Sequence, residues 1–133
     1  MTTLASPRFL RAVLWFDAAS CAGSAAVHLF GAGLLAPLLG LPAGLLVASG
    51  LVLCVCSASA AWIASRDPLP RGPILALSLA NWAWVAGCLA LLFTGAAGTT
   101  LGQFYLVVQA VAVAVLAELQ WFGARRPAAA ALA

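Results

Sequence analysis

The sequence contains no lysine, and charged residues of any kind make up only 7% of its 133 positions. A soluble globular domain carries about 25% charged residues, which keep it dispersed in water. At 65% hydrophobic residues, this chain has more apolar surface than a soluble fold of its size could bury. The scarcity of charge therefore excludes an ordinary water-soluble domain and indicates one membrane domain over residues 1–133.

Basic and nucleophilic groups are also scarce. The six positive charges are dispersed arginines, too few for a surface that tracks nucleic-acid phosphates. His28 is the single histidine, which excludes paired-histidine haem ligation and a histidine-rich metal site. Since no nucleophile and base pair is evident either, we expect no enzyme activity, no catalytic residue, no metal and no cofactor.

The four cysteines do not form a recognisable redox or disulfide pattern. Cys21, Cys54, Cys56 and Cys88 all fall inside apolar stretches, away from aqueous loops. Cys54 and Cys56 project about 200° apart around a helix, which excludes a CxxC-type redox pair. We expect all four to be small, buried packing residues.

Four apolar stretches are long enough to cross a bilayer as helices, at residues 12–36, 43–65, 73–94 and 101–122. Proline and glycine separate them, beginning with Pro37, and a Gly123 stop followed by arginines ends the last one. The predicted fold is all-α, a four-helix up-and-down transmembrane bundle with short loops. The tails at residues 1–7 and 124–133 are expected to be disordered.

The arginines orient this bundle. With four spans, all six arginines fall on one side of the membrane, which the positive-inside rule makes the cytoplasm. The topology is thus predicted to be N-in/C-in. The Ala, Leu, Gly and Arg enrichment without lysine is typical of a GC-rich bacterial genome, so we expect a multi-pass protein of the bacterial inner membrane.

A competing interpretation makes the first stretch a secretory or lipoprotein signal, with residues 18–21 as a loose lipobox. The spacing between the N-terminal arginines and this segment is compatible with such a signal. Asp17 interrupts the apolar stretch before Cys21, however, and hydrophobic sequence continues well past that cysteine, which favours a membrane span.

Ionisable residues within spans are costly and mark candidate sites. Asp17 and Glu118 each lie about five residues from the cytoplasmic end of a predicted span, roughly 7 to 8 Å inside. In one interpretation both carboxylates pair with arginines and anchor helix ends. In the other they form a proton or cation site, because two carboxyl groups in one weakly hydrated layer repel each other.

The first span carries a polar stripe. Asp17, Cys21, Ser24 and His28 recur at spacings of four, three and four, so they share a helix face that should point into the bundle. Gln109 lies at a comparable depth in the fourth span, and we expect it to hydrogen bond to His28.

The third span carries a polar residue among deep aromatic rings. Asn81 is followed by Trp82 and Trp84, which lie too deep for an interfacial belt. They either pack in the bundle or line a pocket that Asn81 closes.

Residues 81–85 (NWAWV) and 109–120 (QAVAVAVLAELQ) resemble segments of small four-span bacterial inner-membrane proteins. The layout also resembles the DoxX-like group. Length and span count are similar to those of small multidrug-resistance transporters, in which a glutamate of the first span couples proton and drug; here that span has Asp17.

The sequence thus predicts a non-enzymatic accessory or structural membrane protein. A proton-linked small-molecule carrier that uses Asp17 and Glu118 is the alternative. The expected partner is the lipid bilayer, together with a second copy of the chain or a larger membrane complex, and not nucleic acid.

Overall fold

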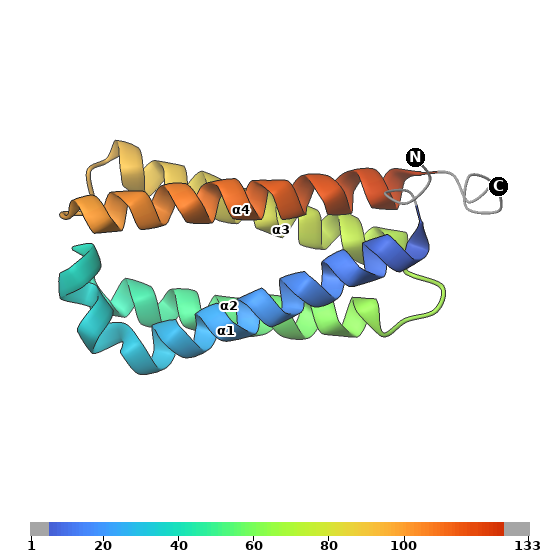
Figure 1. Ribbon diagram of the computed structural model, residues 1–133, viewed down its shortest axis with the longest axis horizontal. Coiled ribbons are helices and arrows are strands. Elements are labelled where there is room, and N and C mark those ends of the chain that lie inside the picture. The colour runs from blue at the N-terminus through green and yellow to red at the C-terminus, as the bar shows by residue number, and fades with distance from the viewer. Residues whose placement is uncertain (1–5, 127–133) are drawn as a thin grey trace.

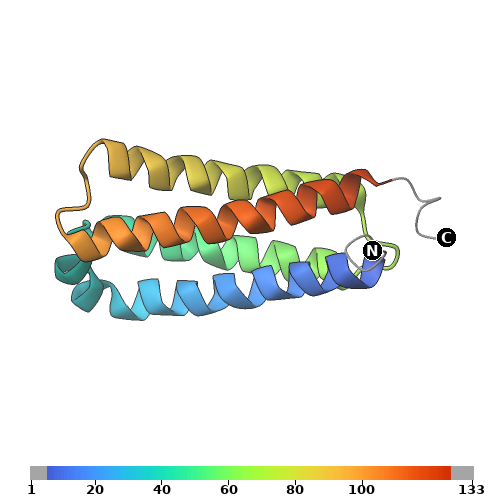
Figure 2. The ribbon, with the colours of Figure 1, turned by 45° about the horizontal axis from the view of Figure 1, so that its top comes forward.

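The computed structural model describes residues 6–126 and consists of helices joined by short turns. Helices α1 (Pro7–Leu39), α2 (Ala43–Ala64), α3 (Arg71–Phe93) and α4 (Thr100–Arg125) run up and down side by side, as Figure 1 and Figure 2 show. All four are long and apolar enough to cross a membrane. The predicted four-helix bundle of an integral membrane protein is confirmed, and the bounds of α2 and α3 lie within two residues of the predicted spans.

Helix α1 is longer than the predicted span at both ends. Its start is fixed by Ser6, whose side chain accepts a hydrogen bond from the backbone N–H of Phe9 at 3.1 Å. Pro37 was predicted to end the helix but lies inside its last turn. Proline has a helical φ and loses only one backbone hydrogen bond there, so the helix continues until Gly40, whose φ of 63° closes it with a left-handed cap.

Helix α4 also continues past its predicted stop at Gly123 and ends at Arg125. A Cβ atom at Gly123 would lie 2.7 Å from Leu10 Cδ1, so this glycine allows close packing of α4 on α1. The expected disordered tails, 1–7 and 124–133, fall largely outside the described residues. Within the described part, Pro7 and residues 124–125 are helical.

The bundle is built from two hairpins. α1 packs along α2 and α3 along α4; α1 also contacts α4, and α2 contacts α3 over a smaller area. The start of α1, the end of α4 and the α2–α3 loop lie at one end, at the right in Figure 1. All six arginines belong to these segments, and we call this the arginine end.

The two remaining loops meet at the opposite end. Thr99 Oγ1 donates a hydrogen bond to the carbonyl of Leu38 at 2.8 Å, and the Gly98 N–H donates to the carbonyl of Gly40 at 3.1 Å. A Cβ atom at Gly102 would lie 1.9 Å from the carbonyl oxygen of Leu39. Only glycine allows the start of α4 to approach the end of α1 this closely.

Large apolar side chains cover the outside, as expected for a surface that faces lipid. Phe30 is 91% exposed and Phe93 86% exposed, whereas Ala60, Ala64 and Ala117 are fully buried. Small residues at the contacts let the helix backbones approach closely. Helix α2 therefore packs closely against its neighbours at Ala60.

The cysteines divide between the inside and the outside. Cys21 and Cys88 are buried and Cys56 is half-buried, but Cys54 is exposed. The prediction that all four are buried is wrong for Cys54, because α2 turns that position away from the other helices. All four are free thiols.

Candidate functional site

Three polar side chains from three helices meet inside the bundle. Asp17 of α1, Asn81 of α3 and Gln120 of α4 are 2%, 5% and 0% exposed. Asp17 is ten residues after the start of α1, about 15 Å along the helix, which is deeper than predicted because α1 begins at Pro7. We call these three residues the polar cluster.

Hydrogen bonds from the side-chain amides of Asn81 and Gln120 hold the polar cluster together. Asn81 Nδ2 donates to Asp17 Oδ2 at 3.1 Å and to Gln120 Oε1 at 3.0 Å, and Gln120 Nε2 donates to the same Asp17 oxygen. The other carboxyl oxygen, Oδ1, accepts only the weak thiol donor of Cys21, at 3.4 Å. Since a carboxylate oxygen can accept about two hydrogen bonds, Oδ1 retains acceptor capacity.

The predicted arginine pairing of the carboxylates is wrong. Between residues 6 and 126 the structure contains one ion pair, Arg11 Nη2 to Asp67 Oδ1 at 3.6 Å. Asp17 lies too deep for the arginines and pairs with amides instead. Glu118 is exposed on the outer surface of α4 while Gln120 points inward, so the two carboxyl groups predicted to form one site do not share it.

A cavity of about 1080 Å³ lies between the two hairpins. Apolar residues such as Leu46, Leu53 and Leu106 form most of its wall. Exposed residues flank it between α2 and α3, at Val52 and Ala83, and between α1 and α4, at Phe16 and Ala112, so it is open to the outer surface between the hairpins. Its polar lining is Asp17, Ser20, Ser24, His28, Ser49, Asn81, Thr94, Tyr105 and Gln109.

The stripe predicted on α1 does face this cavity. Asp17, Cys21 and His28 are buried, Ser24 is half-buried, and all four line it. Asp17 and His28 are eleven residues apart, which is about 16 Å along α1. The cavity is therefore elongated, with Ser20 and Ser24 in the wall between Asp17 and His28.

His28 has a different partner from the one predicted. Its Nε2 is hydrogen bonded to the hydroxyl of Tyr105, and the two rings meet edge to face with centroids 6.0 Å apart. Gln109 Oε1 instead accepts a hydrogen bond from Trp84 Nε1 at 3.3 Å. Among the described residues, the buried His28 Nδ1 has no hydrogen-bond partner.

Trp82 and Trp84, the two tryptophans considered for a pocket, lie on different faces of α3. Trp84 is half-buried and lines the cavity with Asn81, whereas Trp82 is 37% exposed and does not line it. Residues two apart on a helix point about 200° from each other, so one ring must face outward when the other faces inward. The assignment of Trp82 to the pocket is wrong.

No family model, curated protein or solved structure matches this chain. Across residues 6–126, no group of three or more His, Cys, Asp or Glu side chains is placed to hold a metal ion. A carboxyl group with spare acceptor capacity sits beside aromatic and apolar walls, an arrangement that can hold a small molecule bearing a donor or cationic group.

Sequence reasoning missed two contributors to the site. Gln120 and Tyr105 were assigned no role in it, although Gln120 belongs to the polar cluster and Tyr105 is hydrogen bonded to His28. A signal for Gln120 was present. It follows Ala117 by three residues and therefore shares the small-residue face of α4 that packs inward.

Proposed function

We propose that this protein is a non-enzymatic membrane protein that binds a small, mainly apolar molecule with a cationic or hydrogen-bond-donating group. The ligand enters from the bilayer between the two hairpins and occupies the cavity that they enclose. Such binding is the first step of the carrier activity considered from the sequence, with Asp17 as its acidic group and without Glu118.

The placement of Asp17 carries this proposal. The carboxyl group lines a cavity of about 1080 Å³, and its Oδ1 accepts only one weak hydrogen bond. All of its hydrogen-bonding neighbours donate to it, which suits an ionised carboxylate that only accepts. A buried carboxylate without a cationic side chain near it favours a cationic ligand.

The accessory or structural role is the second candidate, and it is supported by a separate observation. The polar cluster ties α1, α3 and α4 together, and Ser57 Oγ ties α2 to the carbonyl of Ala18 at 2.8 Å. A bundle braced in this way could serve within a larger membrane complex or with a second copy of the chain.

The proposal also includes the membrane in which the protein resides and the protein group that it resembles. With six arginines at one end, the positive-inside rule favours an N-in/C-in arrangement in a bacterial inner membrane. The resemblance to the DoxX-like group rests on the layout of the four spans.

Equilibrium binding in mild detergent tests the proposal, with 1-naphthylmethylammonium as the probe and the neutral 1-methylnaphthalene as its uncharged analogue. We expect 1-naphthylmethylammonium to bind more tightly than 1-methylnaphthalene. Asp17→Asn should weaken its binding by about ten- to a hundredfold, the contribution of one hydrogen bond to a charged group, and leave the neutral analogue unaffected.

Glu118→Gln is the matched control, because it removes a carboxylate that lies outside the cavity. It should leave both affinities unchanged. Equal affinity of wild type and Asp17→Asn for the ammonium would rule out the Asp17 site and favour the accessory role.

A further inference from the structure

The side-chain amide of Asn81 has a fixed orientation. Its Nδ2 donates hydrogen bonds to Asp17 Oδ2 at 3.1 Å and to Gln120 Oε1 at 3.0 Å. Because both partner atoms are acceptors, the amide must turn its NH₂ group toward them. The other end of the same amide, the carbonyl oxygen Oδ1, therefore points away from these two partners.

Asn81 Oδ1 is open to the larger cavity, the one of about 1080 Å³ between the hairpins. Asn81 lines that cavity, and no group within residues 6–126 donates a hydrogen bond to its Oδ1. Over the same residues, His28 Nδ1 is the single buried side-chain nitrogen or oxygen atom without a partner. Since Asn81 Oδ1 also lacks a partner, it is not covered by protein, and a ligand in the cavity can reach it.

Asp17 places a second acceptor beside this oxygen. It lines the same cavity, and its Oδ1 accepts only the weak thiol donor of Cys21. The hydrogen bond from Asn81 Nδ2 to Asp17 Oδ2 joins the two side chains, and each free oxygen shares its carbon atom with one end of that bond. A carboxylate oxygen of α1 and an amide oxygen of α3 thus lie close together on the cavity wall.

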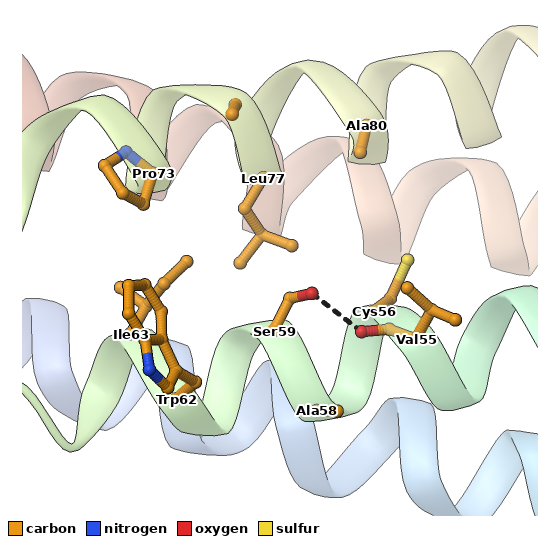
Figure 3. Close-up of a pocket in the computed structure, with 10 residues that line it drawn as sticks. Val55, Cys56, Ala58, Ser59, Trp62, Ile63, Pro73, Leu77 and Ala80 are labelled. Carbon is orange, nitrogen blue, oxygen red and sulfur yellow. Dashed lines mark hydrogen bonds between the residues drawn. The ribbon is translucent and has the colours of Figure 1, made fainter.

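The smaller cavity between α2 and α3 offers no comparable pair. It has a volume of about 560 Å³ and shares Cys56 and Ala80 with the larger one. Figure 3 shows apolar side chains of both helices on its walls, and the Ser59 hydroxyl donating to the carbonyl of Val55 at 2.8 Å. No carboxyl or amide side chain from the described part of the chain lines it. Of these two cavities, the larger one is therefore the place for a ligand with several donors.

Building on the proposed function, we infer that the Asp17 site selects an ammonium with at least two N–H groups, which is a primary or secondary amine in its protonated form. One N–H donates to Asp17 Oδ1 and a second to Asn81 Oδ1. A tertiary ammonium has a donor for only one of these oxygens, and a quaternary ammonium has none. The remainder of the ligand lies against the apolar wall of the cavity.

Equilibrium binding of a methylation series to the purified full-length chain in mild detergent tests this selectivity. The probes are 1-naphthylmethylammonium and its N-methyl, N,N-dimethyl and N,N,N-trimethyl derivatives. The first two should bind with similar affinity, because both have two N–H groups. The dimethyl compound should bind about ten- to a hundredfold more weakly, and the trimethyl compound weaker again by a similar factor, since each step removes a hydrogen bond from a charged group.

Two controls separate hydrogen bonding from bulk and from general charge. The hydrocarbon 1-(2,2-dimethylpropyl)naphthalene has the shape of the trimethyl compound without its charge, and it should bind at least as tightly as 1-methylnaphthalene. If it binds more weakly, the added bulk contributes to the loss, and the Asn81 signal described next decides. Glu118→Gln should leave the whole series unchanged, because Glu118 lies outside the cavity.

A second measurement needs no variant of the polar cluster. Asn81 is the single asparagine of the chain, so a ¹³C label in the asparagine carboxamide reports on this residue alone. Its carbonyl chemical shift in the nuclear magnetic resonance spectrum should change more when the primary or secondary ammonium binds than when the trimethyl compound binds. An equal change with the secondary and trimethyl compounds would overturn the selectivity.

The affinities also distinguish failure of this selectivity from failure of the proposed function. Equal affinity for the secondary and trimethyl compounds, with Asp17→Asn weakening both, would overturn the selectivity and leave the proposed function standing. Tighter binding of the trimethyl compound would do the same, and would indicate a cation–π contact in place of N–H donors. An Asp17→Asn protein that binds all four compounds as wild type does would refute the proposed function, and the selectivity with it.

Discussion

Replacing Asn81 with leucine tests whether the polar cluster holds the bundle together. The substitution removes the donor of two hydrogen bonds between helices, to Asp17 and to Gln120. Such bonds contribute about 0.6 to 1.7 kcal/mol each within membranes. Gln120, which is fully buried, would also be left with an unpaired carbonyl oxygen, at a cost of about 1 to 3 kcal/mol. Because these contributions overlap, we expect a loss of about 2 to 4 kcal/mol in unfolding free energy.

The measurement is loss of helicity by circular dichroism as sodium dodecyl sulfate is titrated into mixed micelles. Gln103→Leu is the control, since Gln103 is exposed in α4 and its loss should change stability little. In the Asn81→Leu background, Gln120→Leu should cost less than it does alone, because the two side chains share a bond. An Asn81→Leu protein within about 0.5 kcal/mol of wild type would refute the structural role of the cluster.

Three further predictions address topology and packing. Reporter fusions after residues 40 and 98 should report the outside, and fusions after residue 69 and at the C-terminus the cytoplasm; a cytoplasmic report after residue 98 would contradict the four-span topology. Ser57→Leu or Ala60→Leu should destabilise the protein by about 1 to 3 kcal/mol through overpacking against α1, and unchanged thermal stability in detergent would contradict the close contact. Gly102→Ala should destabilise the protein because the new Cβ would lie 1.9 Å from the Leu39 carbonyl oxygen, whereas Gly87→Ala meets open space and should be neutral or stabilising; equal thermal midpoints would contradict that reading.

The fold could be predicted from the sequence because two independent patterns agree. Apolar runs of bilayer length set the four helices, and the clustering of arginines requires an even number of spans. The helix ends were less predictable. Pro37 and Gly123 predict helix ends, but both lie inside helices. Helix α1 ends at its cap, Gly40, and α4 continues past Gly123, where it packs against Leu10.

The candidate site could be predicted only in part, for a related reason. Helical periodicity on α1 placed Asp17 and His28 on one inner face, as the structure has them. Periodicity does not give the rotation of one helix against another, and so it did not give the partners. His28 meets Tyr105 and not Gln109, and Asp17 meets Gln120 and not Glu118, because those choices depend on how the hairpins pack.

The division of the polar cluster between hairpins has a consequence for biogenesis. Asp17 belongs to the first hairpin, whereas Asn81 and Gln120 belong to the second. During synthesis from the N-terminus, Asp17 therefore enters the membrane before either amide that will hold it has been made. Gln120, the last donor, lies in the second half of α4. A chain that stalls before α4 would have only the Asn81 amide for the Asp17 carboxyl group, so the polar cluster is complete only after α4 has been inserted.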